Sequence, residues 1–292
     1  MGEASPADAL PADVGAAMAH ARAQGVDRLD AKLLLGALLG QSRSWLMIHD
    51  EAPLTPEQAQ RFVAWIAQRR DAVPIAYLLG EKEFHGLSLQ VNQHTLVPRP
   101  DTEILVDWAL ELLAASGQAQ PAVIDLGTGS GAIALAIKHR HPAAQVEALD
   151  LSEGALTVAR ANAQRLGLAV RFHQGNWWEP LAGRRFDLIV SNPPYIAGDD
   201  PHLPALRHEP RQALTPEGNG LSALQTLIDG APAHLHPGGW LLLEHGYDQA
   251  EPVARALAVA GFTDIACRRD LGEQPRVSGG RWRGPANGRA AG

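Results

Sequence analysis

Apolar residues recur at helical spacing in the first 80 residues of the chain. Residues 28–39 carry leucines three and four positions apart, which is the spacing of one face of a helix. Thr55, Pro56 and Gln58 together have the pattern of a capping box with proline at the first helical position, so a helix is predicted over 55–70. The pattern predicts a small helical bundle over residues 1–80.

The pattern changes after residue 80. The segment EFHGLSLQV alternates apolar and polar residues, which is typical of a hairpin, and it is followed by LVPRPDTE, whose two prolines favour a stiff, extended backbone. We interpret 81–101 as a hairpin linker. Asp101 or Thr102 is then expected to cap a helix that carries Ile104, Leu105, Trp108 and Leu112.

From Ala122 onward, short apolar strands alternate with helical segments. The strand segments are AVIDL, QVEALD, AVRFH, FDLIVS and WLLLEH, then 262–268, and a last strand near 276–282. Alternation of this kind predicts a mostly parallel sheet with helices on both faces, and therefore an α/β domain over 102–292. The tail 284–292 is expected to be disordered.

Composition narrows the class of protein. Apolar residues make up 46% of the 292 residues and charged residues 20%, as in globular proteins, and no apolar run approaches the roughly 18 residues of a membrane helix. The net charge of −7 argues against a stable nucleic-acid partner. A single cysteine and the absence of a signal-peptide pattern favour a cytoplasmic protein, which we expect to be a monomer.

A glycine-rich turn, DLGTGSG, joins the first strand of the sheet to a helix at residues 125–131. Glycines allow the backbone to turn tightly and to approach a ligand closely. The turn suits S-adenosylmethionine, but Gly127, Gly129 and Ala132 also fit the dinucleotide pattern G-x-G-x-x-G/A, and a purely structural turn is a third interpretation.

Two carboxylates favour S-adenosylmethionine as the ligand of this turn. Asp125 precedes the glycines, where it could accept a hydrogen bond from the ammonium group of the cofactor; beside a pyrophosphate it would be repelled. Asp150 ends the next strand, where it could accept from ribose hydroxyls. We therefore predict that Asp125 and Asp150 contact the cofactor.

The segment Asn192-Pro193-Pro194-Tyr195 follows the strand FDLIVS and is the most specific signal in the chain. The Asn192 carbonyl and a backbone carbonyl of the Pro-Pro unit could accept from the two N–H groups of an amide or exocyclic amine, while Tyr195 offers a flat face to the substrate. Proline fixes φ and keeps these acceptors in place. The segment predicts methyl transfer to a planar nitrogen; its alternative is an ordinary turn.

Together these motifs resemble the PrmC/HemK family of protein-(glutamine-N5) methyltransferases, from about residue 28 to 283. The matching segments are RRDAVPIAYLLGEKEF, LVPRPDTE, DLGTGSGAIALA, FDLIVSNPPYI and LLLEHG. The resemblance implies a helical domain, a hairpin and a seven-stranded class I, Rossmann-like methyltransferase domain. The sequence departs from the family pattern at His85, because the family often has an aromatic residue at this position.

The resemblance also implies roles for individual residues. The implied substrate is the glutamine of the Gly-Gly-Gln motif of class 1 peptide chain release factors, surrounded by Asn192, Pro193 and Tyr195, with Arg99 and Glu209 shaping the pocket. Apart from the resemblance, Glu244 at the end of the strand WLLLEH could orient the loop or be a buried strand-end carboxylate satisfied by backbone. The implied contacts with S-adenosylmethionine are Gly127, Thr128, Gly129, Ser130, Gly131, Asp150, Trp177 and Asn192.

Other functions remain open at the level of sequence. NPPY is shared with adenine-N6 methyltransferases, and a related family modifies a glutamine of a ribosomal protein. A cofactor-binding adaptor and a nicotinamide enzyme are further alternatives. No metal site is predicted, because His139 and His141, like His234 and His236, are spaced two apart. Cys267 is interpreted as a buried, small apolar residue.

Overall fold

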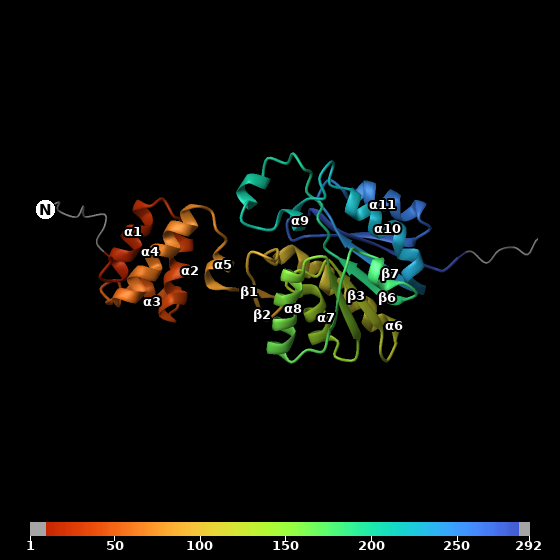
Figure 1. Cartoon of the computed structure of the whole chain (residues 1–292), viewed down its shortest axis with the longest axis horizontal. Helices are drawn as coiled ribbons and strands as arrows, with labels where there is room; N and C mark the ends of the chain where they lie inside the picture. Colours follow the sequence, from red (N-terminus) through yellow and green to blue (C-terminus); the bar gives the residue numbers. More distant parts are fainter. Residues whose placement is uncertain (1–9, 286–292) are drawn as a thin grey trace, which may run out of the picture. The chain divides into compact units, whose positions relative to one another are not determined.

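The computed structural model describes residues 10–285 of the chain (Figure 1). The chain divides into two compact units, the first ending at Gly80 and the second beginning at Glu81. Of the tail that was expected to be disordered, residues 286–292 lie outside the described residues.

The first unit consists of helices. They are α1 (Val14–Ala23), α2 (Arg28–Leu39), α3 (Arg43–Ile48), α4 (Pro56–Arg70) and α5 (Ile75–Leu79). The capping box at the start of α4 is confirmed, because the Thr55 side chain accepts from the Gln58 backbone and the Gln58 side chain accepts from the Thr55 backbone. Leu34 and Leu35 of α2 and Phe62 and Ile66 of α4 are fully buried in the core of this unit.

A hairpin opens the second unit. Strands β1 (Glu81–Phe84) and β2 (Leu87–Gln90) pair antiparallel, and Phe84 and Leu89 are buried in the core of this unit. Asn162 bonds both backbone groups of Gln90, accepting from the N–H at 2.7 Å and donating to the C=O at 3.0 Å. The hairpin is therefore packed into the second unit, whereas the sequence pattern suggested a linker.

Seven strands form the main sheet of the described residues, as predicted. They are β3 (Ala122–Leu126), β4 (Gln145–Asp150), β5 (Arg171–Gln174), β6 (Phe186–Ser191), β7 (Leu235–Glu244), β8 (Thr263–Arg269) and β9 (Pro275–Arg281), in the order β5-β4-β3-β6-β7-β9-β8. The first five are parallel, and β9 runs antiparallel to its neighbours β7 and β8.

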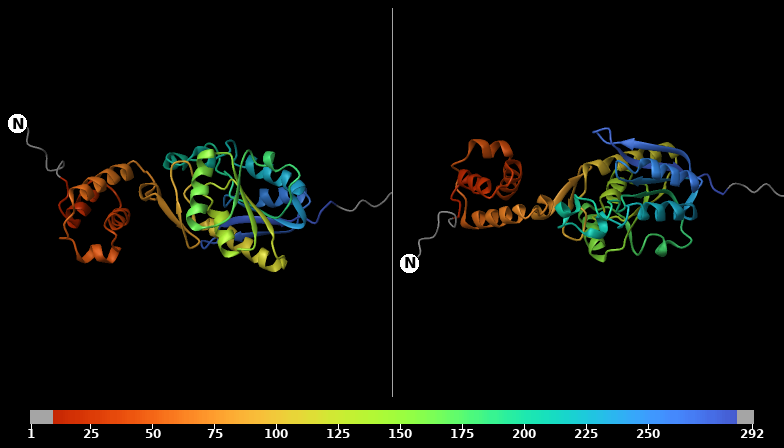
Figure 2. Two further views of the ribbon diagram at one scale, coloured as in Figure 1. Left: turned by 60° about the horizontal axis from the view of Figure 1, so that its bottom comes forward. Right: turned by 90° about the horizontal axis from the view of Figure 1, so that it is seen from above.

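Helices cover both faces of this sheet (Figures 1 and 2). On one face, α6 (Glu103–Ser116), α7 (Ala132–Arg140) and α8 (Glu153–Leu166) pack against the strands; on the other lie α10 (Ser222–His234) and α11 (Ala250–Val259). Each face has its own apolar core. Two covered faces explain why the inner strands are almost continuously apolar.

The strand order reverses between β3 and β6. The chain proceeds from β3 to β4 and β5 on one side, then crosses to β6 on the other, so the carboxyl ends of β3 and β6 are neighbours. Leu126 pairs with Ser191, and the Ser191 hydroxyl donates to the Leu126 carbonyl at 2.5 Å. Ligands of open α/β sheets bind at such a reversal point. The glycine turn and the NPPY segment both start here.

Candidate active site

The glycine turn is built from left-handed backbone conformations. Gly127, Gly129 and Gly131 have φ angles of +74°, +56° and +86°, which residues with a Cβ rarely adopt. The N–H groups of Gly127 and Thr128 both donate to the carbonyl of Leu149 on β4, at 2.8 and 2.9 Å. These bonds hold the turn against the end of the neighbouring strand.

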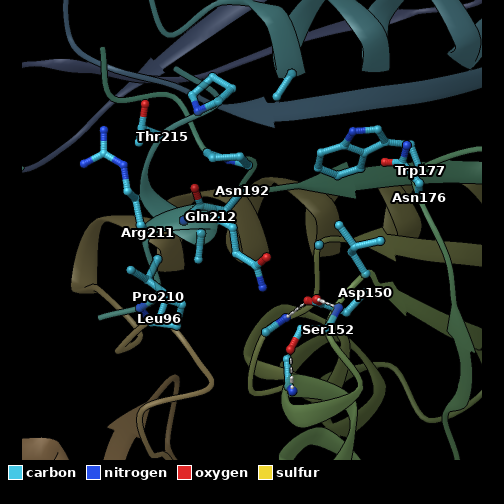
Figure 3. A pocket seen from close by; sticks show the side chains of 18 of the residues that line it. Leu96, Asp150, Ser152, Asn176, Trp177, Asn192, Pro210, Arg211, Gln212 and Thr215 are labelled. Atoms are coloured by element: carbon cyan, nitrogen blue, oxygen red, sulfur yellow. Dashed lines mark hydrogen bonds between the residues drawn. The ribbon is translucent and has the colours of Figure 1, made fainter. Parts of the chain in front are cut away.

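Asp150 at the end of β4 receives two backbone hydrogen bonds. Its Oδ2 accepts from Gly129 N–H at 2.8 Å and its Oδ1 from Ser152 N–H at 2.9 Å (Figure 3). Burial raises the pKa of this carboxyl, and the backbone bonds counteract that rise. The carboxylate is thus fixed in orientation, with lone pairs left to accept from a bound ligand.

A cavity of about 640 Å³ extends from this turn. Such a volume is typical of small-molecule sites. In Figure 3, Trp177 and Asp150 lie on one side of the cavity, and Leu96, Pro210 and Arg211 lie on the other. Six residues that were predicted for the site line it, namely Gly127, Gly129, Asp150, Trp177, Asn192 and Pro194.

Trp177 forms part of this cavity, and its neighbour Trp178 does not. The Trp177 ring lies 3.5 Å from the point where a Cβ on Gly127 would stand, so the ring packs against the turn. Trp178 donates from Nε1 to the Thr226 carbonyl and stacks on His234. Of the two adjacent tryptophans, Trp177, which the sequence predicted for the site, is the one that lines the cavity.

The other predicted cofactor contacts in the turn do not line the cavity. Asp125, Thr128 and Ser130 are buried, and these three and Gly131 are absent from the residues that line the cavity. Asp125 Oδ2 accepts from the Thr128 hydroxyl at 2.6 Å and from Ala134 N–H at 3.2 Å. Burial raises the pKa of Asp125 to about 7, and its Oδ1 has no partner among the described residues. Direct contact between Asp125 and the cofactor stays a prediction.

Asn192 stands between this cavity and a second, smaller one. Its Nδ2 donates to the hydroxyl of Thr102 at 3.2 Å, and within residues 10–285 its Oδ1 accepts no hydrogen bond. The second cavity has a volume of about 80 Å³. It is lined by Leu96, Arg99, Asn192, Pro193, Tyr195, Ile196, Leu206, Ala213 and Leu214. Asn192, Pro193 and Tyr195 of the NPPY segment thus line the small cavity, and Asn192 lines both.

Hydrogen bonds hold both the side chain and the backbone of Tyr195. Its hydroxyl donates to Glu244 Oε1 at 3.2 Å, and its backbone carbonyl accepts from Gln249 Nε2 at 2.9 Å. Burial raises the pKa of Glu244 to about 7 and also raises the pKa of Tyr195. A Cβ on Gly220 would stand 2.2 Å from the Tyr195 carbonyl oxygen, so this approach requires glycine.

Two segments that were not predicted as part of the site complete it. Residues of α9 (Arg211–Leu214) and of the loop after it, with His94–Leu96 from the segment after the hairpin, form much of the wall of the large cavity. Glu209, which precedes α9, accepts from Arg99 and from the Val97 backbone. Sequence gave no periodic signal for these loops, because their side chains become neighbours only through the tertiary fold.

No cluster of three or more potential metal-binding side chains is present among residues 10–285. In the same residues, no helix has the length and apolarity required to cross a membrane.

Family models match most of the second unit and most of the first. The "Methyltransferase small domain" matches residues 102–248, and the "PrmC N-terminal domain" matches residues 16–80. In the solved structures, a methyltransferase from Pyrococcus furiosus superposes with a TM-score of 0.53 at 19% identity, over 75% of this chain and 100% of that chain. That likeness supports the fold.

The seven-stranded sheet, the glycine turn with Asp150 and the family models define a class I, Rossmann-like methyltransferase that uses S-adenosylmethionine. Among the relatives, release factor glutamine methyltransferases of Bordetella pertussis and Xylella fastidiosa are 49% and 48% identical to this chain. The alignments cover 88% and 91% of this chain and 95% and 97% of the relatives. The chain belongs to the release factor glutamine methyltransferase family.

Proposed function

We propose that this protein transfers a methyl group from S-adenosylmethionine to the side-chain N5 of the glutamine in the Gly-Gly-Gln motif of class 1 peptide chain release factors. The observation that carries this proposal is the position of Asn192. Its side chain lines both the large cavity and the small one, and its Oδ1 is available as an acceptor.

The large cavity suits the cofactor. Gly127 and Gly129 leave room for a close approach of the ligand, Asp150 offers a fixed carboxylate to ribose hydroxyls, and Trp177 offers an apolar ring to the adenine. When bound, S-adenosylmethionine supplies an electrophilic methyl on a positively charged sulfur. Asn192 lines both cavities, as do Leu96 and Ala213, and it is the one of these three residues with a polar side chain.

The small cavity suits the glutamine carboxamide. Asn192 Oδ1 and the Pro193 carbonyl would accept from the two N–H groups of the glutamine, and Tyr195 would cover its plane. Both prolines fix φ, and the Tyr195 ring is anchored on Glu244, so this geometry requires little rearrangement. The acceptors orient the nitrogen lone pair toward the large cavity.

Acceptors placed in this way stabilise the transition state more than the ground state. As the nitrogen forms its new bond, positive charge develops on it and its N–H groups become stronger donors. Oδ1 of Asn192 therefore strengthens its bond during transfer. The surplus proton can leave to water afterwards, so the chain need not supply a general base before attack.

The volume of the small cavity favours a carboxamide over a purine. A slot of about 80 Å³ corresponds to a few water molecules, at about 30 Å³ each, and admits a flat three-atom group more readily than a bicyclic base. The net charge of −7 likewise offers little attraction to nucleic acid. The relatives are named for release factors, which supports a translation factor over a ribosomal protein as substrate.

We further propose that the protein works in the cytoplasm, where translation factors act, and that it is a monomer without a stable nucleic-acid partner. Size-exclusion chromatography with light scattering tests the monomer, and a mass near 62 kDa, twice the 31.1 kDa of one chain, would reject it.

Mass spectrometry tests the proposed reaction. The protein is incubated with S-adenosylmethionine and an unmodified release factor, and the Gly-Gly-Gln peptide is expected to gain one methyl group on its glutamine. Asn192→Ala should lower kcat on the order of 100-fold, as for loss of one transition-state contact. Methylation that persists after the glutamine is replaced by alanine would reject this substrate. A wild-type protein that binds the cofactor but transfers no methyl group would favour a cofactor-binding adaptor, and a fully active Asn192→Ala variant would point to another catalytic group.

A further inference from the structure

A cluster of three polar residues lies next to Asn192. It consists of Thr102, at the junction of the 3-10 helix Pro100–Thr102 and α6, Glu244 at the end of β7, and Tyr195. Thr102 is 5% exposed and Glu244 is 1% exposed. Neither residue lines the large or the small cavity, so neither is positioned to touch a ligand.

One hydrogen bond connects this cluster to Asn192, and a second lies within the cluster. Asn192 Nδ2 donates to Thr102 Oγ1 at 3.2 Å, and the Tyr195 hydroxyl donates to Glu244 Oε1 at 3.2 Å. The Thr102 hydroxyl lies beside the Glu244 carboxyl and lowers its pKa. Glu244 Oε2 makes no hydrogen bond among the described residues, so it is a buried acceptor to which Thr102 can donate by rotating its hydroxyl.

The single proton of the Thr102 hydroxyl determines which atom of the Asn192 carboxamide can face Thr102. A threonine hydroxyl carries one proton and can donate only once. If that proton is directed to the Glu244 carboxylate, Thr102 can only accept from Asn192. The carboxamide of Asn192 must then turn its NH₂ toward Thr102 and its Oδ1 toward the cavities.

We propose that Thr102 and Glu244 are positioning residues that fix the orientation of the Asn192 carboxamide, so that Oδ1 faces the methyl-accepting nitrogen. Without the Glu244 carboxylate, the Thr102 proton is free to donate to Asn192 Oδ1, and the amide can rotate by half a turn. It would then present NH₂, a donor, to a substrate nitrogen that also carries only donors. This inference rests on the proposed function for its effect on catalysis, and on the network alone for the amide orientation.

The protonation state of Glu244 should control this orientation. Burial is the main cause that raises the pKa of Glu244 to about 7; Thr102, Tyr195 and Arg276 lower it, and Asp101 raises it further. Above pH 7 the carboxylate accepts from Thr102 and the amide is held. Below pH 7 the protonated carboxyl no longer requires the Thr102 proton. The Glu244-dependent part of the activity should therefore be lost as the pH falls through 7.

Steady-state kinetics with matched variants test the effect on catalysis. Thr102→Val keeps the shape but removes the hydroxyl, and Thr102→Ser keeps the hydroxyl. We expect Thr102→Val and Glu244→Gln to lower kcat about tenfold or more, and Thr102→Ser to restore kcat to within about threefold of wild type. The dissociation constant of S-adenosylhomocysteine should change less than twofold. Thr157→Val, which removes an exposed hydroxyl bonded to its own helix, is the matched control.

Nuclear magnetic resonance tests the orientation without any methyl transfer. The side-chain NH₂ signal of Asn192, assigned by its absence in Asn192→Ala, should shift between pH 6 and 8.5 in the wild-type protein. It should not titrate in Glu244→Gln, and it should resonate elsewhere in Thr102→Val. A signal that is identical in wild type and Thr102→Val, or that still titrates in Glu244→Gln, would overturn the inference. A wild-type protein that does not methylate a release factor would reject the proposed function, while this spectrum would still decide on the network.

Discussion

The guanidinium of Arg99 pairs with the carboxylate of Glu209, 110 residues further along the chain. The Glu209 side chain is 2% exposed, and its second oxygen accepts from the Val97 backbone at 3.0 Å. One buried carboxylate thus joins the segment after the hairpin to the segment before α9, and Arg99 lines the small cavity. This ion pair closes one side of the proposed glutamine site.

Breaking this pair should weaken substrate binding more than cofactor binding. We expect Arg99→Met to raise the KM for the release factor about tenfold, roughly 1.4 kcal/mol, because the small cavity opens and Glu209 loses its partner. The affinity for S-adenosylhomocysteine should stay within about twofold. Arg255→Met, which breaks an exposed pair with Glu251, is the control. Equal effects of Arg99→Met on both ligands would contradict this assignment.

Asp150 should determine affinity for the cofactor. Asp150→Asn keeps the size of the side chain but replaces one acceptor oxygen with a donor, which opposes the Gly129 or the Ser152 N–H. We expect the dissociation constant of S-adenosylhomocysteine to rise by a factor on the order of 10 to 100, or about 1.4 to 2.8 kcal/mol, in calorimetric titrations. Asp187→Asn is the control, since Asp187 also accepts a backbone N–H, from Ala122, but lies near the start of β6. A normal affinity in Asp150→Asn would remove this residue from the site.

Two glycines of the turn should respond differently to alanine. Both Gly129 and Gly131 have positive φ, so each substitution should cost about 1–2 kcal/mol of stability. A Cβ on Gly131 would also stand 3.0 Å from Leu135 and 3.3 Å from Ala159, whereas one on Gly129 meets nothing within 4 Å. Gly131→Ala should therefore be the less stable variant in urea denaturation. Gly129→Ala, at the cavity wall, should bind the cofactor more weakly. A Gly129→Ala variant that is less stable than Gly131→Ala would contradict the turn geometry.

The burial of Asp125 predicts a pH dependence of stability. Its pKa in the folded state is about 7, above the ordinary value of 3.8, so the folded protein holds this proton over a range in which the unfolded chain has lost it. The free energy of unfolding should consequently fall as the pH rises from about 4 to 7. Each pKa unit corresponds to about 1.4 kcal/mol, so the contribution is on the order of a few kcal/mol. Denaturation curves of wild type and Asp125→Asn at pH 5.5 and 8 measure it; parallel changes in the two proteins would contradict it.

The strands of the main sheet were predictable because their burial on two faces leaves long apolar runs. QVEALD and FDLIVS coincide with β4 and β6, and the helix over 28–39 coincides with α2. The cap of α6 was less predictable. Thr102 occupies the N-cap position, but its side chain makes no capping bond and bonds Asn192 instead, so a tertiary contact displaced the local one.

Features without a local signal were missed or misassigned. Helix α10 was not predicted, although it packs against β7 and forms part of the cavity wall through Ser222, Ala223 and Thr226. The prediction for Cys267 was wrong, because the residue is exposed on β8, where one face of the strand is open to solvent. The motifs lie in segments that border the two cavities, and the fold determines which of their residues line a cavity.

A crystal structure with S-adenosylhomocysteine and glutamine would test the central claim most directly. We predict the cofactor product in the large cavity and the glutamine carboxamide in the small one, with its nitrogen within about 3.2 Å of Asn192 Oδ1 and of the Pro193 carbonyl. A glutamine bound elsewhere, or an Asn192 side chain turned away from that nitrogen, would contradict the account.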